Sequence, residues 1–124
     1  MPEDFHSLDQ LRFCDAVTAE LDYIRSLGTN PNLTLATANL GAYEAILYIM
    51  SSGEWGVPVY QVITNVKSGY STQSGILARL RAMRQLGLIE DRPGHKKSQV
   101  CLAPSQTLLR ELGPLLLKRH GGAQ

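Results

Sequence analysis

Residues 71–102, STQSGILARLRAMRQLGLIEDRPGHKKSQVCL, decide how this chain folds. In their first half, apolar residues recur at the spacing that lines one face of a helix. They predict a helix over about 71–86, with Ser71 as its N-cap and Gly87 at its C-terminal end. The core face of this helix consists of Ile76, Leu80 and Met83. The opposite face, which is predicted to be exposed, carries Ser74, Ala78, Arg81 and Gln85.

The second half of the stretch predicts a two-stranded β-hairpin. Beyond the glycine the helical spacing is lost, and residues 88–92 and 98–102 have the character of short strands. Between them lies a turn-forming loop that begins with Pro93 and Gly94. The loop continues with His95, Lys96 and Lys97. The sequence therefore predicts a basic hairpin directly after an exposed helix.

Helical periodicity is also present on both sides of this stretch. The helices that it predicts cover about residues 7–27, 39–52 and 58–66, followed by a leucine-rich helix that opens at Pro104 and Ser105. Residues 28–32 predict a turn-rich loop, and residues 55–57 predict a short extended piece. Gly113 and Pro114 are expected to kink or split the last helix, because proline removes a hydrogen bond from a helix interior.

From residue 39 onward, the predicted order is helix, short extended piece, helix, tight turn, helix, hairpin and helix. Two short helices that brace a third, followed by a hairpin, are typical of a winged helix-turn-helix. We therefore expect a mainly α protein with a small β-hairpin, a winged helix-turn-helix with extra N- and C-terminal helices. The length predicts a single domain over residues 1–124. It comprises an N-terminal helix and loop (1–34), a winged-helix core (35–103) and a C-terminal helix (104–124).

The charge of the chain is unevenly distributed. The formal net charge is only +1, but residues 1–66 carry −6, residues 67–97 carry +5 and residues 98–124 carry +2. A local concentration of positive charge is typical of a surface that binds a polyanion such as DNA. A plain solvated surface can have the same composition, so charge alone leaves both interpretations open.

The predicted helix and hairpin supply the residue types that contact duplex DNA. Hydroxyl and amide side chains near a helix N-terminus suit phosphates or base edges, and glutamine can form two hydrogen bonds with adenine. Arginine and lysine suit phosphates, and arginine also suits a guanine edge. The predicted DNA-binding residues are Ser71, Thr72, Gln73, Ser74, Arg79, Arg81, Arg92, His95, Lys96 and Lys97. Two simpler interpretations stay open, namely that Ser71 only caps the helix and that the hairpin is merely basic.

The run Leu80–Arg92, LRAMRQLGLIEDR, and the segment Val100–Pro104, VCLAP, resemble parts of the MarR-type winged-helix regulators. The first segment is similar to the end of that family's recognition helix together with its first wing strand. The second is similar to the segment that leads from the wing into the C-terminal helix. The resemblance extends over about Leu35 to Leu112. It implies a sequence-specific transcriptional regulator whose recognition helix (71–86) enters the major groove, while the wing (92–98) lies on the backbone or in the minor groove.

The same resemblance implies a homodimer that pairs through its N- and C-terminal helices. The first helix has an apolar stripe on one face, and the last helix has more leucines than a small domain needs. The implied interface residues are Val17, Leu21, Ile24, Leu109, Leu112 and Leu116. In the alternative interpretation, both helices simply pack on their own domain.

Other classes of function find little support in the sequence. It has no glycine-rich phosphate loop, nucleophile motif or metal-ligand spacing, so we expect no catalysis, no cofactor and no metal. Cys14 lies on the apolar stripe of the first helix and Cys101 on an inward-facing strand, so both thiols are predicted to be buried. The acidic N-terminus does not resemble a signal peptide, and a cytoplasmic location is expected.

Two alternatives to a transcriptional regulator stay open. A winged helix can act as a protein-interaction module without binding DNA, and a phage or plasmid replication or partition factor would use the same DNA surface. The family resemblance also allows a small-molecule effector between the terminal helices and the winged-helix core, although no residue marks such a site.

Overall fold

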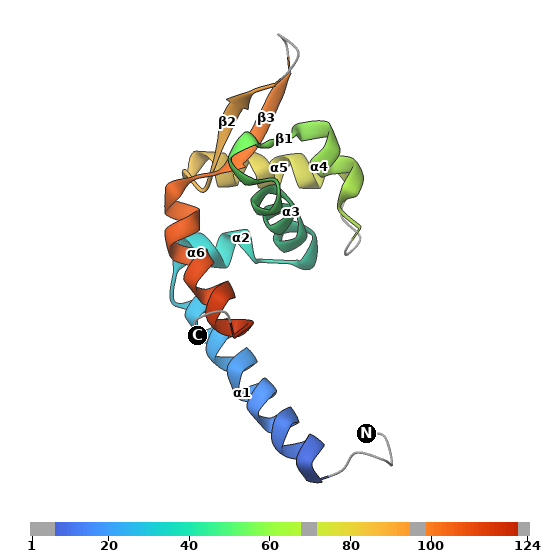
Figure 1. Cartoon of the computed structure of the whole chain (residues 1–124). Helices are drawn as coiled ribbons and strands as arrows, with labels where there is room; N and C mark the ends of the chain where they lie inside the picture. The colour runs from blue at the N-terminus through green and yellow to red at the C-terminus, as the bar shows by residue number, and fades with distance from the viewer. Residues whose placement is uncertain (1–6, 68–71, 95–98, 122–124) are drawn as a thin grey trace.

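The computed structural model of the chain describes residues 7–67, 72–94 and 99–121, which are mainly helical (Figure 1). The helices are α1 (Ser7–Gly28), α2 (Pro31–Ala36), α3 (Leu40–Ser51), α4 (Val59–Asn65), α5 (Gln73–Gln85) and α6 (Gln106–Arg119). A 3₁₀ turn, η1, covers Gly53–Trp55, and the strands are β1 (Val57–Pro58), β2 (Ile89–Pro93) and β3 (Val100–Pro104).

Helices α3, α4 and α5 pack with a small antiparallel sheet to form the centre of the molecule. The strand order is β1-β3-β2, with Val57 opposite Leu102 and Ile89 opposite Pro104. The core between helices and sheet includes the fully buried side chains of Ile46, Ile49, Val62, Met83, Leu88 and Leu102. The predicted fold class is confirmed: the chain is a winged helix-turn-helix with extra helices at both ends. The predicted extended piece at 55–57 is only partly correct, because Trp55 ends the 3₁₀ turn and Val57 begins strand β1, which makes the sheet three-stranded.

Helix α5 has the core face that its sequence predicts, because Ile76, Leu80 and Met83 are all buried. Its N-cap is Thr72, whose Oγ1 accepts a hydrogen bond from the backbone N–H of Gly75 at 3.1 Å. The prediction that Ser71 caps this helix was therefore wrong by one residue, and Ser71 itself lies outside the described residues. Serine and threonine are both good caps, so composition alone does not decide between neighbours.

Helix α2 occupies part of a region for which the sequence predicted a loop over 28–32. Asn30 caps it by accepting hydrogen bonds from the backbone N–H groups of Asn32 and Leu33, and Pro31 fits the first helical position. Leu33 and Ala36 are buried in the core. The loop prediction was wrong because two turn-forming residues here start a short helix that packing stabilises.

Helix α6 runs without interruption from Gln106 to Arg119, so the expected split at Gly113 and Pro114 does not occur. Pro114 lies on the exposed side of the helix, where its missing N–H leaves no buried group without a partner. Leu112 and Leu108 are fully buried and fix the helix on the winged-helix core. Packing on one face thus maintains a helix that the local sequence weakens.

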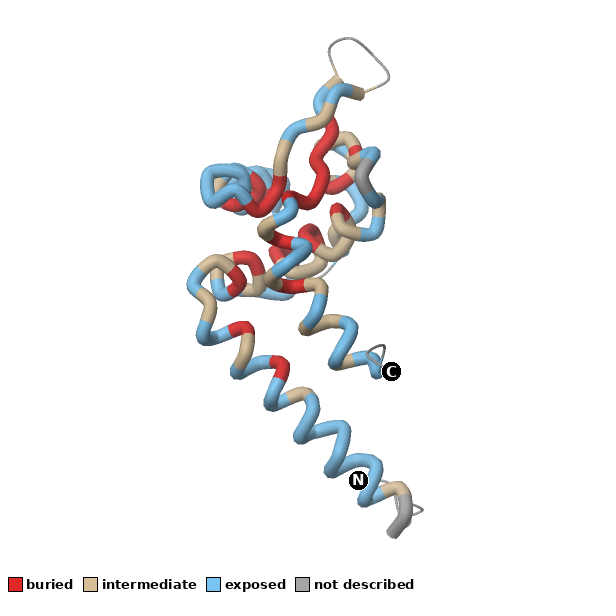
Figure 2. The backbone as a smooth tube through the Cα atoms, turned by 60° about the vertical axis from the view of Figure 1, so that its left-hand side comes forward, coloured by how far each residue is buried: buried red, intermediate tan, exposed pale blue. Residues whose placement is uncertain are grey.

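Helix α1 projects away from the rest of the chain (Figures 1 and 2). From Asp9 onward, Tyr23 and Leu27 near its C-terminal end are the only buried residues of this helix, and we call the mostly exposed part before them, residues 9–22, the arm. Cys14 lies on the arm and is exposed, so its predicted burial was wrong, whereas Cys101 is buried as predicted. None of the helices in the described ranges is both long and apolar enough to span a membrane.

Candidate nucleic-acid interface

The outer face of α5 is open to solvent. Ser74, Ala78, Arg81 and Gln85 are all exposed, in contrast to the three buried residues on the core face. No other part of the described chain covers this face, so it is free to enter a groove about as wide as a helix. The small side chains of Ser74 and Ala78 would allow close approach to base edges.

The first turn of α5 presents polar groups to solvent. Thr72, Gln73 and Ser74 are exposed, and the Thr72 hydroxyl lies 3.2 Å from that of Ser74. The cap satisfies the backbone N–H of Gly75, which leaves other N–H groups of the first turn available for an outside acceptor. These predicted contact residues are therefore brought together at one end of the exposed face.

The arginines near this face fall into two groups. Arg79 and Arg81 are exposed, and within the described residues neither forms an ion pair. By contrast, Arg84 Nε lies 2.9 Å from Asp91 Oδ1, and Arg92 Nη2 lies 2.8 Å from Glu90 Oε1. Arg79 and Arg81 are thus the described arginines of α5 that are available to an outside anion.

The hairpin rises from the side of α5. Helix α5 packs against β2, and the Arg84–Asp91 ion pair connects the two elements. The hairpin points away from the arm (Figure 1). The predicted wing residues His95, Lys96 and Lys97 lie outside the described residues. Arg92, near the loop end of strand β2, is half-buried and is held by Glu90 on its own strand.

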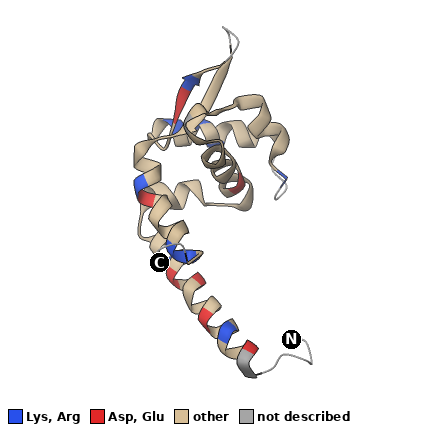
Figure 3. Cartoon of the chain, in the orientation of Figure 1, with Lys and Arg blue, Asp and Glu red and all other residues tan. Residues whose placement is uncertain are grey.

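Acidic residues are absent from the sequence between Trp55 and Ile89, which forms β1, α4 and α5. The same segment includes Lys67, Arg79, Arg81 and Arg84. Acidic side chains gather instead along the arm, at the other end of the molecule (Figure 3). Within this segment the positive charges are therefore not offset by acidic residues, and the nearest described carboxylates on strand β2, Glu90 and Asp91, are paired with Arg92 and Arg84.

A second group of residues joins the arm to the winged-helix core, and we call it the tyrosine–arginine cluster. It consists of Glu20 and Tyr23 from α1, Tyr43 from α3 and Arg119 from α6. Arg119 donates to Glu20 Oε2 at 2.8 Å and stacks on the Tyr23 ring at 4.5 Å. The hydroxyls of Tyr23 and Tyr43 share a hydrogen bond. Burial, and then the bond to Tyr43, raise the pKa of the Tyr23 hydroxyl, so it stays protonated.

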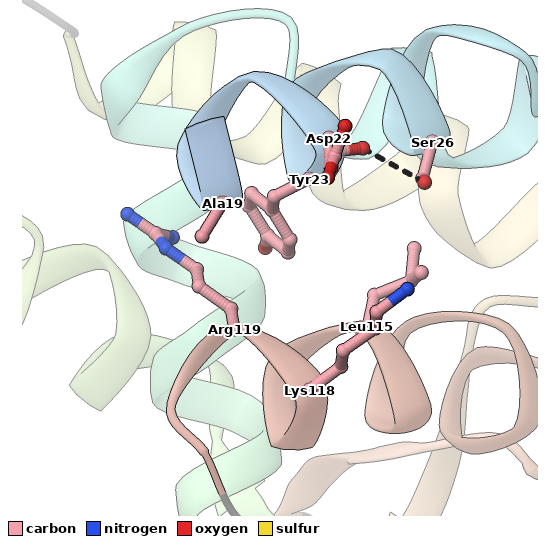
Figure 4. A pocket seen from close by; sticks show the side chains of 7 residues that line it. All are labelled: Ala19, Asp22, Tyr23, Ser26, Leu115, Lys118 and Arg119. Carbon is pink, nitrogen blue, oxygen red and sulfur yellow. Dashed lines mark hydrogen bonds between the residues drawn. The ribbon is translucent and has the colours of Figure 1, made fainter. Parts of the chain in front are cut away.

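Next to this cluster, α1 and α6 enclose a hollow of about 110 Å³. Tyr23 and Ala19 face it from α1, and Leu115, Lys118 and Arg119 face it from α6 (Figure 4). Sequence reasoning missed both the cluster and the hollow. Their residues come from three helices, and no spacing in the sequence connects them.

The predicted dimer residues do not share one environment. Val17, Leu21, Ile24 and Leu109 are exposed, and Leu116 is half-buried. Leu112 is different, because none of its surface is exposed in the single subunit. Its prediction as an interface residue was wrong, since the side chain packs in the core of its own chain.

Comparisons with known proteins give a limited result. Neither a protein-family model nor a curated protein sequence matches this chain. A solved structure that it resembles is the ligand-free form of the organohalide-sensing transcriptional regulator RdhR, with a TM-score of 0.48 and 16% sequence identity. The match covers 98% of this chain and 70% of that one.

Proposed function

We propose that this chain is a sequence-specific, double-stranded DNA-binding transcriptional regulator of the MarR type that acts in the cytoplasm. The observation that supports it best is the exposed outer face of α5, which carries Arg81, lies beside the likewise exposed Arg79 and belongs to a segment without acidic residues. Helix α5 enters the major groove, where Gln73 and Ser74 meet base edges and Arg79 and Arg81 meet phosphates or guanine.

The hairpin serves as the wing beside this helix. Its loop places His95, Lys96 and Lys97 on the phosphate backbone or in the adjacent minor groove. The ion pair between Arg84 and Asp91 supports this arrangement, because it connects the base of the wing to α5. The paired Arg92 contributes to the shape of the wing and less to its charge.

The regulator works as a homodimer that pairs through α1 and α6. Helix α1 has an apolar stripe formed by Val17, Leu21 and Ile24, which the subunit itself leaves exposed. Leu109 and Leu117 on α6 are exposed as well. Exposed apolar side chains in a row are typical of a protein interface. A two-fold pair of subunits would present two copies of α5 to the two halves of a palindromic site.

Binding of the full chain to duplexes from a random pool tests this function directly. We expect retention on heparin that falls with added salt, a mobility shift with duplex, and recovery of a palindrome after selection. A winged helix that serves only as a protein-interaction module would give none of these results. Recovery of bound duplexes without any shared sequence would contradict sequence-specific binding.

Replacing Lys96 and Lys97 together with alanine is expected to weaken binding to every duplex. Each lost phosphate contact should lower the dependence of log affinity on log salt by about one unit. The measurement is a salt series of mobility shifts with selected and random duplexes. Replacing Lys118 with alanine is a suitable control, because this exposed lysine lies on α6. An unchanged salt slope in the double variant would remove the hairpin from the DNA interface.

Replacing Leu21 with glutamate is expected to convert the dimer into a folded monomer. The side chain is exposed in the single subunit, so the substitution buries a charge only where a second subunit covers the stripe. Sedimentation velocity at micromolar concentration measures the change. Ala16→Glu adds the same charge on a different side of α1, because residues five apart do not share a helix face, and should leave the mass unchanged. A wild-type monomer in this experiment would contradict the dimer.

A further inference from the structure

A second hollow, of about 600 Å³, lies between the base of the wing and the start of α4. Trp55 from η1 and Tyr60 and Gln61 from α4 line one side, and Pro93 and Gln99 from the hairpin line the other. We call it the aromatic hollow. Trp55 is 82% exposed and Tyr60 is 59% exposed, so two large aromatic side chains are left uncovered by their own subunit.

The backbone holds Trp55 firmly in this exposed position. The next residue, Gly56, has φ +82°, and a Cβ there would lie 3.0 Å from the carbonyl oxygen of Leu102 and 3.2 Å from Cys101 Cβ. Only glycine allows η1 to approach strand β3 so closely. The tryptophan is therefore presented by a fixed turn that packs on the sheet, as is typical of a binding contact.

The position of the hollow connects the two parts of the proposed DNA interface. Helix α4 packs against both α5 and β3, and its first residues follow strand β1, whose Pro58 lies opposite Cys101 of the hairpin. Gly94 and Gln99, which line the hollow, directly flank the loop that contains His95, Lys96 and Lys97. A duplex with α5 in its major groove and the wing in the next minor groove must pass one backbone across the surface between them.

The chemistry of the hollow suits that backbone better than a charged protein segment. None of the described residues that line it is charged, and the sequence between Trp55 and Ile89 contains no acidic residue that would repel phosphate. Aromatic rings pack well on the apolar face of deoxyribose, and tyrosine hydroxyl and glutamine amide groups are common phosphate ligands. Gln61 Nε2 lies 3.5 Å from the Tyr60 hydroxyl, so both polar groups point to one place.

We propose that the aromatic hollow binds the sugar–phosphate backbone of duplex DNA between the wing and α5. Trp55 and Tyr60 pack on deoxyribose, and the Tyr60 hydroxyl and the Gln61 amide meet a phosphate. This inference rests on the proposed function and adds a contact that uses no positive charge. It therefore adds affinity that does not depend on salt, beside the salt-dependent contacts of the arginines and lysines.

The chain contains a single tryptophan, so the intrinsic fluorescence of Trp55 reports on the hollow directly. The experiment titrates the full chain with a random-sequence duplex of about three helical turns and follows Trp emission and mobility shift together. We expect the emission to change in parallel with binding. Trp55→Ala and Tyr60→Ala should each weaken binding about tenfold, equivalent to roughly 1.4 kcal/mol, with an unchanged salt slope.

Two further variants test whether the effect depends on an aromatic ring in this hollow. Trp55→Phe retains a ring and should recover most of the affinity, and Leu40→Ala removes another exposed apolar side chain that does not line this hollow. The inference would be overturned if the wild type binds duplex without a change in Trp emission and if Trp55→Ala and Tyr60→Ala bind as well as the wild type. That result would favour a protein ligand for the hollow. Absence of any duplex binding by the wild type would overturn the proposed function as well, so the two failures are distinct.

Discussion

Replacing Ala78 with glutamate is expected to abolish duplex binding and to leave the fold intact. Ala78 lies in the middle of the exposed face of α5, and glutamate is a good helix former, so the subunit tolerates the change. In the complex, the new carboxylate would meet base edges and phosphates at the floor of the groove. Contacts between like charges at an interface cost several kcal/mol, so affinity should fall at least ~100-fold.

Mobility shift and circular dichroism, measured on the same sample, check this result. The matched control is Arg110→Gln, which changes the net charge by the same amount on the exposed surface of α6. It should bind DNA nearly as well as the wild type, since α6 takes no part in the groove. Full binding by Ala78→Glu would mean that the DNA interface lies elsewhere on the molecule.

The sequence predicted the elements in which local periodicity and packing agree. The stripe of Ile76, Leu80 and Met83 defined α5, and the change of period after Gly87 defined the hairpin. Both elements bury one face and expose the other, so a repeat in the sequence is enough to identify them. For the same reason, the exposed face of α5 could be predicted from the sequence, whereas its contacts with DNA stay a prediction.

Features that depend on distant contacts could not be predicted in this way. Tyr23 and Tyr43 are 20 residues apart, and Glu20 and Arg119 are 99 apart. Only the packing of α6 along α1 brings the last pair together. Helix α2 is a similar case, because Leu33 becomes buried only when its neighbours cover it. The aromatic hollow likewise joins η1, α4 and the hairpin, which are separate in the sequence.

The exposed apolar stripe of the arm shows a further limit of periodicity. Cys14 and Leu21 recur at helical spacing, from which the sequence predicted a buried face, yet the subunit buries the side of α1 that holds Tyr23 and Leu27. A helix that is apolar on two sides has two surfaces to cover. One is covered within the subunit, and the other is the surface that we assign to the dimer.

Replacing Leu112 with alanine is expected to destabilise the subunit by about 2–5 kcal/mol. Its side chain is completely buried between α6 and the winged-helix core, so the change leaves a cavity that rigid neighbours fill only in part. A domain of this size has a total stability of roughly 5–15 kcal/mol, so the loss is a large share of it. Thermal and urea unfolding of the purified chain measure the change.

Leu109→Ala is the informative comparison, because Leu109 lies on the same helix but is 39% exposed. Its loss should reduce the unfolding free energy by about 1 kcal/mol or less and should act mainly on dimerisation. Leu112→Ala should show the opposite pattern: early unfolding, with an unchanged dimer at temperatures where the chain is still folded. A Leu112→Ala variant that is fully stable but monomeric would return this residue to the dimer interface. That result would mean that the side chain of Leu112 contributes little to the packing of α6 on its own winged-helix core.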